Sequence, residues 1–187
     1  MYADLVVRAQ KGDLTAFAWL AEPLYPRLNR IAYSIMGDVG AAEDATQQAM
    51  VRVWRNLPQL RDPERFESWC FQSLVNECRN EWRRRKRWRC DSAGGVMPER
   101  AAPDQFSVVD DREQLDRAFE RLSLEHRTVL VLFHYADMSH ERIAEALGVA
   151  EGTARSRLHR AHEALRSALE ADARPATPEH TAREVAP

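Results

Sequence analysis

The stretch SHERIAEALGVAEGTARSRLHRAHEAL (residues 139–165) decides the fold of the second half of the chain. Ser139 can cap a short helix, and Gly148 with Val149 can make a tight turn. A second helix is expected to begin near Glu151, and its inward positions share helical spacing. They are Ala154, Leu158, Ala161 and Leu165. This order of elements predicts a helix-turn-helix.

The outward face of this second helix carries side chains that suit the major groove of DNA. The face holds Arg155, Ser156, His159 and Arg160, and Arg157 lies in the same run. An arginine can donate two hydrogen bonds to guanine, and a serine can donate or accept one. An ordinary helical hairpin is the alternative. The turn length, the small residue Ala144 and the basic outward face together favour a helix that binds duplex DNA.

The strongest feature of the first half is the basic run WRRRKRWR (residues 82–89). Basic side chains neutralise phosphates, and the release of counterions drives that binding. The indole rings of Trp82 and Trp88 can stack on unpaired bases. A solvated helix terminus is the alternative, and a membrane-surface patch would need a wider apolar face. The pattern favours binding of nucleic acid.

Apolar spacing predicts helices throughout the first half. Asp13 can cap a helix whose buried stripe is expected to hold Phe17, Leu20, Leu24, Leu28, Ile31 and Ile35. Pro23 and Pro26 interrupt that stripe, so a kink or break is expected there. A second helix should run to Leu57, and a third from about Phe66 to Trp88. No alternation typical of strands is present, and the sequence predicts an all-α protein.

Composition divides the chain into two helical domains with a flexible connector. Residues 1–90 are periodic, and residues 91–110 contain prolines and glycines that break the period. Periodicity returns over residues 111–171, and the tail at 172–187 is predicted to be disordered.

Several classes of function are disfavoured by what the sequence contains. The formal net charge is −2, so only the position of charges points to nucleic acid. No apolar run approaches the length that spans a bilayer and no signal pattern opens the chain, so a cytoplasmic protein without membrane insertion is expected. The three cysteines and six histidines show no metal-ligand spacing. We expect no metal, no cofactor and no enzymatic activity.

These motifs, taken in order, resemble the extracytoplasmic-function sigma factors of bacterial RNA polymerase. The resemblance covers most of residues 3–170. It rests on QKGD (10–13), AEDATQ (42–47), the segment from Phe66 to the arginine run, and GTARSRLHRA (152–161). It implies a sigma region 2 bundle at 1–90 and a sigma region 4 helix-turn-helix at 111–171. It also implies three partners: core RNA polymerase, promoter DNA as duplex and as single non-template strand, and an anti-sigma factor.

The resemblance implies roles for particular residues. Asp44, Gln47 and Gln48 would dock on the polymerase. Arg61 and Asp62 would help to hold a flipped base of the minus-ten element. Further contacts to that element would come from Asn76, Asn80, Arg83, Arg84, Arg85, Lys86 and Arg87. The minus-thirty-five element would be read by Arg155, Ser156, Arg157, His159 and Arg160. Ser73 and Glu77 stand where the family usually has apolar residues, so looser packing of the third helix is expected.

Two other functions fit part of the sequence. A stand-alone helix-turn-helix regulator would explain the second half, but would leave the face around Asp44 and the basic helix without a role. A recombinase that uses the helix-turn-helix for targeting would need a placed nucleophile in the first half. Ser34, Ser68 and Ser73 are the only serines there, and the last two lie in the long third helix.

Overall fold

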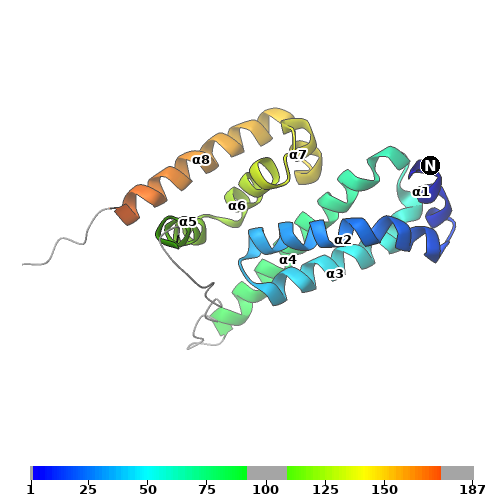
Figure 1. Cartoon of the computed structure of the whole chain (residues 1–187), viewed down its shortest axis with the longest axis horizontal. Coiled ribbons are helices and arrows are strands. Elements are labelled where there is room, and N and C mark those ends of the chain that lie inside the picture. Colours follow the sequence, from blue (N-terminus) through cyan, green and yellow to red (C-terminus); the bar gives the residue numbers. More distant parts are fainter. Residues whose placement is uncertain (1, 92–108, 174–187) are drawn as a thin grey trace, which may run out of the picture.

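The computed structural model describes residues 2–91 and 109–173, and within these ranges every regular element is helical (Figure 1). The first half is built from four α-helices and two short 3-10 turns. They are α1 (Tyr2–Gln10), α2 (Leu14–Met36), α3 (Val39–Asn56), η1 (Leu57–Gln59), η2 (Pro63–Arg65) and α4 (Phe66–Asp91). The all-α prediction is confirmed.

The second half contains the predicted helix-turn-helix. Its elements are α5 (Val109–Arg121), α6 (Leu124–Leu130), the π-helical turn η3 (Val131–Tyr135), α7 (His140–Leu147) and α8 (Glu151–Ala173). Ser139 caps α7 by accepting a hydrogen bond from the Arg142 backbone N–H. Gly148 ends α7 in the left-handed region, with φ of 66°. The predicted cap, turn and start of the following helix are therefore confirmed.

The predicted connector and tail fall mostly on residues outside the described ranges. At their edges the helices extend further than the sequence indicated. Helix α4 ends at Asp91, α5 begins at Val109, and α8 continues to Ala173.

The sequence predicted a kink or a break at Pro23 and Pro26, and the break is excluded, because α2 runs without interruption from Leu14 to Met36. A proline removes one helical hydrogen bond and crowds the carbonyl of the preceding turn. Both prolines lie on the exposed side of α2, where water can reach the affected carbonyls. The opposite side carries a continuous buried stripe that includes Leu20, Leu24 and Leu28. Burial of that stripe keeps the helix continuous.

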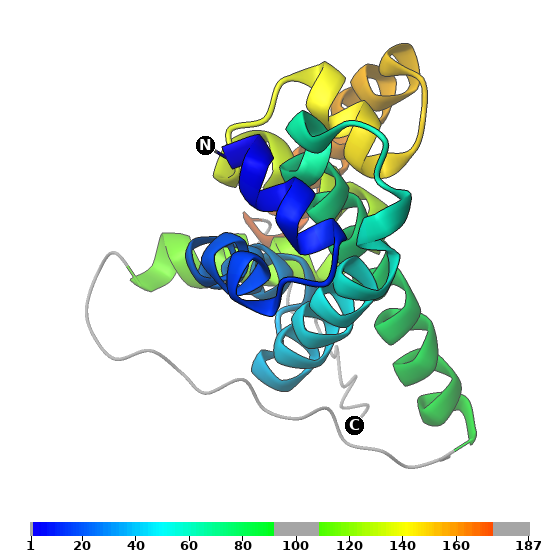
Figure 2. The same cartoon turned by 90° about the vertical axis from the view of Figure 1, so that its right-hand side faces the viewer.

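The long helix α4 is the central element of the first half. It packs against α2 and α3 on one side, and α7 and α6 of the second half lie against another side (Figures 1 and 2). One contiguous cluster of buried apolar residues includes side chains of both halves. The sequence predicted two helical units but not their packing against each other.

The predicted looseness at Ser73 and Glu77 is also wrong. Ser73 is 5% exposed and Glu77 is 8% exposed, so both lie in the packed part of α4. The Glu77 carboxylate lies 2.7 Å from the Arg52 guanidinium of α3. An ion pair at the α3–α4 contact thus takes the place of an apolar contact.

Candidate nucleic-acid interface

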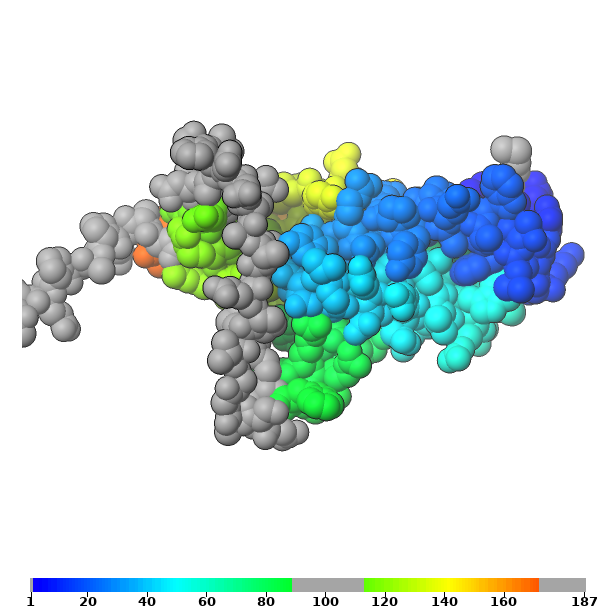
Figure 3. Space-filling view, turned by 60° about the horizontal axis from the view of Figure 1, so that its bottom comes forward, coloured from blue at the N-terminus to red at the C-terminus, as the bar shows by residue number. Residues whose placement is uncertain are grey.

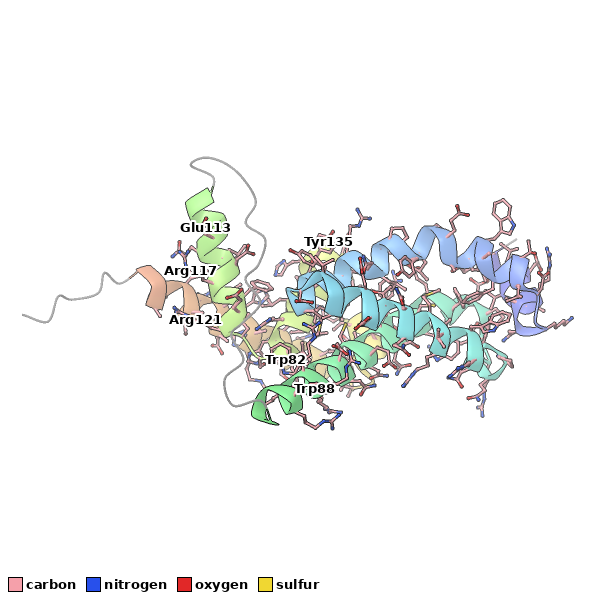
Figure 4. The ribbon with its side chains drawn as sticks, turned by 90° about the horizontal axis from the view of Figure 1, so that it is seen from below. Trp82, Trp88, Glu113, Arg117, Arg121 and Tyr135 are labelled. Atoms are coloured by element: carbon pink, nitrogen blue, oxygen red, sulfur yellow. The ribbon has the colours of Figure 1, made fainter. Side chains whose placement is uncertain are left out.

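The C-terminal end of α4 forms a basic projection from the body of the first half. Figure 3 shows this end of the helix standing out from α2 and α3. Arg83, Lys86 and Arg87 are exposed there, and Trp88 is 72% exposed. Trp82 lies further back, where α4 meets α6, as Figure 4 shows. The two tryptophans therefore occupy different environments.

Four of the predicted minus-ten residues share one stripe along α4. Asn76, Asn80, Arg83 and Arg87 follow each other at spacings of four, three and four, which places them on one face of a helix. Asn76 is half-buried, and the other three are exposed. Asn76 accepts a hydrogen bond from Arg79, and Asn80 donates one to Glu77. We call these four residues the α4 stripe.

Arg84 and Arg85 turn away from this stripe toward α3. The Arg84 guanidinium lies 2.7 Å from Glu81 and 3.2 Å from Asp44. The Arg85 guanidinium lies 2.8 Å from Glu81 and 3.1 Å from Asp38. Two of the five successive basic residues thus fasten the end of α4 to the start of α3.

Glu81 is the centre of this network. Its burial alone would raise the pKa of the carboxyl group, but the hydrogen bonds from Arg84 and Arg85 outweigh that effect and lower the pKa. The pKa of Asp38 is lowered as well, first by the hydrogen bond from the Ala41 backbone and then by Arg85. Both carboxylates are therefore charged partners of the arginines at neutral pH.

The predicted flipped-base loop lies at the other end of α4. Asp62 accepts a hydrogen bond from the Glu64 backbone and thereby caps η2, and Arg61 is exposed. Gln10 of α1 holds the loop by donating to the carbonyls of Leu57 and Leu60, at 3.2 and 2.7 Å. The structure does not bring Arg61 and Asp62 together with the basic end of α4. A nucleic acid that contacts both groups must run along the helix.

The predicted polymerase-binding residues lie on the outer face of α3. Asp44, Gln47 and Gln48 are exposed, whereas Ala45 and Ala49 of the same helix are buried. Gln48 borders a shallow hollow that also includes Val51, Arg52, Arg55, Asn56 and Glu77. The sequence did not indicate that Asp44 also contacts the basic end of α4.

Helix α8 presents most of the predicted duplex-binding residues to the outside. Arg155, Ser156, His159 and Arg160 are exposed, and Ala154, Leu158 and Ala161 are buried on the opposite side. Neighbours on the same helix orient these side chains. Arg155 lies 2.8 Å from Glu151, and Arg160 donates to the Ser156 carbonyl at 3.3 Å.

Arg157 differs from the other members of the run. Its side chain is only 18% exposed and lies 4.0 Å from Glu125 of α6. It faces away from the open side of α8, so the five predicted residues do not form one surface.

Cys70 and Cys78 are buried within α4 and have free thiols. Burial raises the pKa of both, to about 12 for Cys78, so they are protonated and unreactive at neutral pH. Within residues 2–91 and 109–173, no cluster of three or more potential ligands could hold a metal ion. The same described helices include none with the length and hydropathy of a membrane span.

Sequence reasoning missed Arg127, a buried cation of α6. It donates to the carbonyls of Leu122 and Glu120, at 3.2 and 2.7 Å. Its guanidinium also lies 5.3 Å from the ring centre of Trp82. The one available signal was an arginine at a position where helical spacing from Leu124 and Leu130 predicts an apolar residue.

Comparison with known protein families gives two matches in the order of the two halves. Residues 20–88 match sigma-70 region 2, and residues 112–165 match sigma-70 region 4. The ECF RNA polymerase sigma factor SigL of Mycobacterium tuberculosis is 36% identical over 85% of this chain and 94% of its own length. SigW of Bacillus subtilis, also an ECF sigma factor, is 27% identical over 90% of this chain and 97% of its own length.

Solved structures show the same arrangement of helices. CnrH in complex with the cytosolic domain of CnrY matches with a TM-score of 0.66 and 26% identity, over 91% of this chain and 98% of that one. The sigma factor RpoE of Bartonella quintana, in complex with the anti-sigma factor NepR, matches with a TM-score of 0.65 and 27% identity, over 83% and 98%. The two matched regions, their order and the full-length relatives place this chain in the extracytoplasmic-function family of RNA polymerase sigma factors.

Proposed function

We propose that this chain is an alternative sigma factor that works through three surfaces placed on three helices. The outer face of α3 binds core RNA polymerase, α4 captures the melted minus-ten element, and α8 reads the minus-thirty-five element as duplex. The observation that carries the proposal is the α4 stripe. Its residues Asn80, Arg83 and Arg87 are exposed on a helix that packs against α3 and against α6 and α7 of the second half.

The residues of α4 suit single-stranded DNA. Amide side chains at Asn76 and Asn80 can bond to base edges, and Arg83, Lys86 and Arg87 can neutralise phosphates. Arg84 and Arg85 contribute positive potential near the strand while they hold α4 against α3. Arg61 and Asp62 contact the end of the single DNA strand that lies beside the start of α4. No nucleotide hydrolysis is needed, because binding of the open strand supplies the free energy.

The exposed side of α8 suits the major groove. Arg155, Ser156, His159 and Arg160 can contact base edges there. Arg157, which faces α6, is better placed to support the helix than to read a base. Each of the two promoter contacts is weak alone. They become bivalent when polymerase holds the two halves at the promoter spacing.

The related RpoE structure holds an anti-sigma factor. We propose that a protein of that kind also controls this chain by covering the same helices. We further propose that the chain acts in the cytoplasm and has no catalytic activity of its own.

In vitro transcription tests the function. Purified chain and core polymerase are incubated with a genomic library, and the transcript start sites are sequenced. Start sites that share upstream elements at fixed spacing are the expected result. A variant that carries both Arg155→Ala and Arg160→Ala should no longer initiate at these start sites, although it should still bind polymerase. Polymerase alone and polymerase with a housekeeping sigma factor serve as controls. Start sites identical to the polymerase-alone control would overturn the proposal, and a sequence-specific footprint without polymerase would favour a stand-alone regulator.

A further inference from the structure

The buried carboxylate of Glu77 borders the α4 stripe and bonds to one of its members. One carboxylate oxygen, Oε1, lies 2.7 Å from the Nε atom of Arg52 on α3. The other oxygen, Oε2, accepts a hydrogen bond from the Nδ2 atom of Asn80 at 3.2 Å. The two oxygens of Glu77 therefore hold a partner on α3 and a partner in the α4 stripe at the same time.

The chemistry of these groups fixes which way the Asn80 amide faces. A carboxylate in an ion pair with a guanidinium accepts hydrogen bonds and donates none. Only the nitrogen of a side-chain amide can donate, so the nitrogen of Asn80 must face Glu77. The oxygen lies on the other side of the amide carbon and is directed away from Glu77. Because Asn80 is exposed, this oxygen is available to a ligand that lies along the stripe.

Asn76, one turn earlier in the stripe, is held in the opposite orientation. Its Oδ1 atom accepts a hydrogen bond from the Arg79 guanidinium at 3.4 Å. A guanidinium donates hydrogen bonds and accepts none, so the oxygen of Asn76 must face Arg79 and the amide nitrogen is turned away. Two identical side chains of one stripe thus present opposite ends, and in each case a charged neighbour on α4 decides which end.

The end that Asn80 presents limits the bases that it can bind. A carbonyl oxygen needs a hydrogen-bond donor on the base. Adenine, cytosine and guanine each carry an exocyclic amino group, and thymine carries none. The single ring N–H of thymine lies between two carbonyl oxygens, which repel the oxygen of Asn80. An Asn80 side chain held in this orientation therefore discriminates against thymine.

We propose that Glu77 determines specificity for the minus-ten element, because it holds the Asn80 oxygen toward the strand and so favours a base with an amino group over thymine. The inference rests on the proposed role of the α4 stripe in binding the melted strand. Glu77 acts through Asn80 and is therefore a positioning residue. An apolar side chain at this position would leave the Asn80 amide free to rotate.

Glu77→Gln is the informative variant, because it keeps the shape of the side chain and removes one acceptor. The remaining carbonyl oxygen should stay with Arg52, since a hydrogen bond from a charged donor is the stronger one. The amide nitrogen at position 77 then faces Asn80, which has to turn its oxygen inward and its nitrogen outward. An outward nitrogen donates to the carbonyl oxygens of thymine. The base preference at this one position should therefore reverse.

Transcription by core polymerase with the full-length chain, on a promoter library randomised over the minus-ten element, measures the preference. Asn80→Ala identifies the position concerned, because discrimination should be lost there. The unmodified chain should favour amino bases over thymine at this position by about threefold to tenfold, the range of one hydrogen bond. Glu77→Gln should bring that ratio below one and leave the other positions unchanged. Glu113→Gln, in an ion pair confined to α5, should keep the original ratio.

Two further variants distinguish positioning from a general structural role. In a chain that already carries Asn80→Ala, Glu77→Gln should cause no further change of base preference. If Glu77→Gln fails to fold, Glu77→Leu replaces the buried charge with an apolar group, a change that proteins often tolerate, and its ratio should be about one. A folded variant of Glu77 that keeps the original ratio, or one that lowers activity evenly at every position, would overturn the inference.

A measurement without polymerase separates this inference from the proposed function. Nuclear magnetic resonance of the isotope-labelled chain reports the side-chain amide of Asn80, whose signals are identified by their absence in Asn80→Ala. These signals should shift in Glu77→Gln and stay in place in Glu113→Gln. If they shift but no protein supports promoter-specific transcription, the proposed function fails and the orientation of Asn80 stands. If transcription is normal but neither the signals nor the base ratio respond, the inference fails and the function stands.

Discussion

The Asp44 carboxylate on α3 lies 3.2 Å from the Arg84 guanidinium on α4. The two side chains belong to different proposed surfaces, one for polymerase and one for DNA. Both are more than half exposed, at 57% and 56%. Because exposed ion pairs add only about 0–1 kcal/mol to stability, the pair can open when either partner binds. A polymerase that engages Asp44 would leave Arg84 paired with Glu81 alone.

Asp44→Arg should therefore abolish association with core polymerase and leave the fold intact. The loss of the pair with Arg84 should cost less than about 1 kcal/mol, because Glu81 still holds that arginine. Co-purification with core polymerase measures association, and thermal unfolding measures the fold. Glu113→Arg is the control with the same change of charge. Normal co-purification of Asp44→Arg would contradict the assignment of α3 as the docking face.

Local features of this protein could be predicted from sequence because they depend on neighbours in the chain. The cap at Ser139, the turn at Gly148 and the exposed side of α8 follow from spacing within one short segment. The contacts of Arg84 and Arg85 with α3 could not be predicted in this way. Helical geometry fixes the angle between two residues but does not show which face will meet another helix.

The packing of the two halves depends on residues far apart in the chain. Glu67 and Arg142 are 75 positions apart, and no periodic pattern relates them. Arg127 is a similar case. Its burial is explained only by its partners in the folded protein, which are the Trp82 ring and the two backbone carbonyls that accept its hydrogen bonds. The error at Pro23 had another source, because a local rule about proline was outweighed by a long buried stripe.

Glu81 makes the protein sensitive to acid. Its pKa is lowered in the folded protein, so it contributes stability that is complete above its ordinary value of 4.5 and is lost as the pH falls through the lowered value. Glu81→Gln should reduce the free energy of unfolding at neutral pH by roughly 1–3 kcal/mol. It should also flatten the dependence of stability on pH below 4.5.

Urea unfolding at a series of pH values measures both effects. Glu43→Gln, which changes an exposed carboxylate of α3, is the matched control. A variant at Glu81 that loses stability equally at all pH values would show that packing, and not charge, is the contribution of this residue.

Pro23→Ala should stabilise the protein. The backbone N–H of the alanine can complete the hydrogen bond to the Trp19 carbonyl within the continuous helix α2. The gain of helix propensity, up to about 3 kcal/mol, is partly offset by the greater freedom of the unfolded chain. We expect a net increase of about 1–2 kcal/mol, measured by urea unfolding. The control is Ala18→Pro, at another exposed position of α2, which should destabilise the protein. A loss of stability in Pro23→Ala would contradict the prediction. It would mean that the proline ring makes a contact worth more than the restored hydrogen bond.

Arg160→Ala tests direct reading of the upstream element. Arg160 is exposed on α8 and its guanidinium is held near the Ser156 carbonyl, which aims it along the open face of the helix. Loss of a bidentate contact should weaken discrimination at one base pair by roughly 1–3 kcal/mol and leave other positions unaffected. Transcription from a promoter library randomised over the upstream element measures the base discrimination at each position of that element. Arg166→Ala removes the same charge from an exposed site two turns further along α8, and it should lower activity evenly across sequences. If Arg160→Ala also lowers activity evenly, its contact is to the phosphate backbone and not to a base.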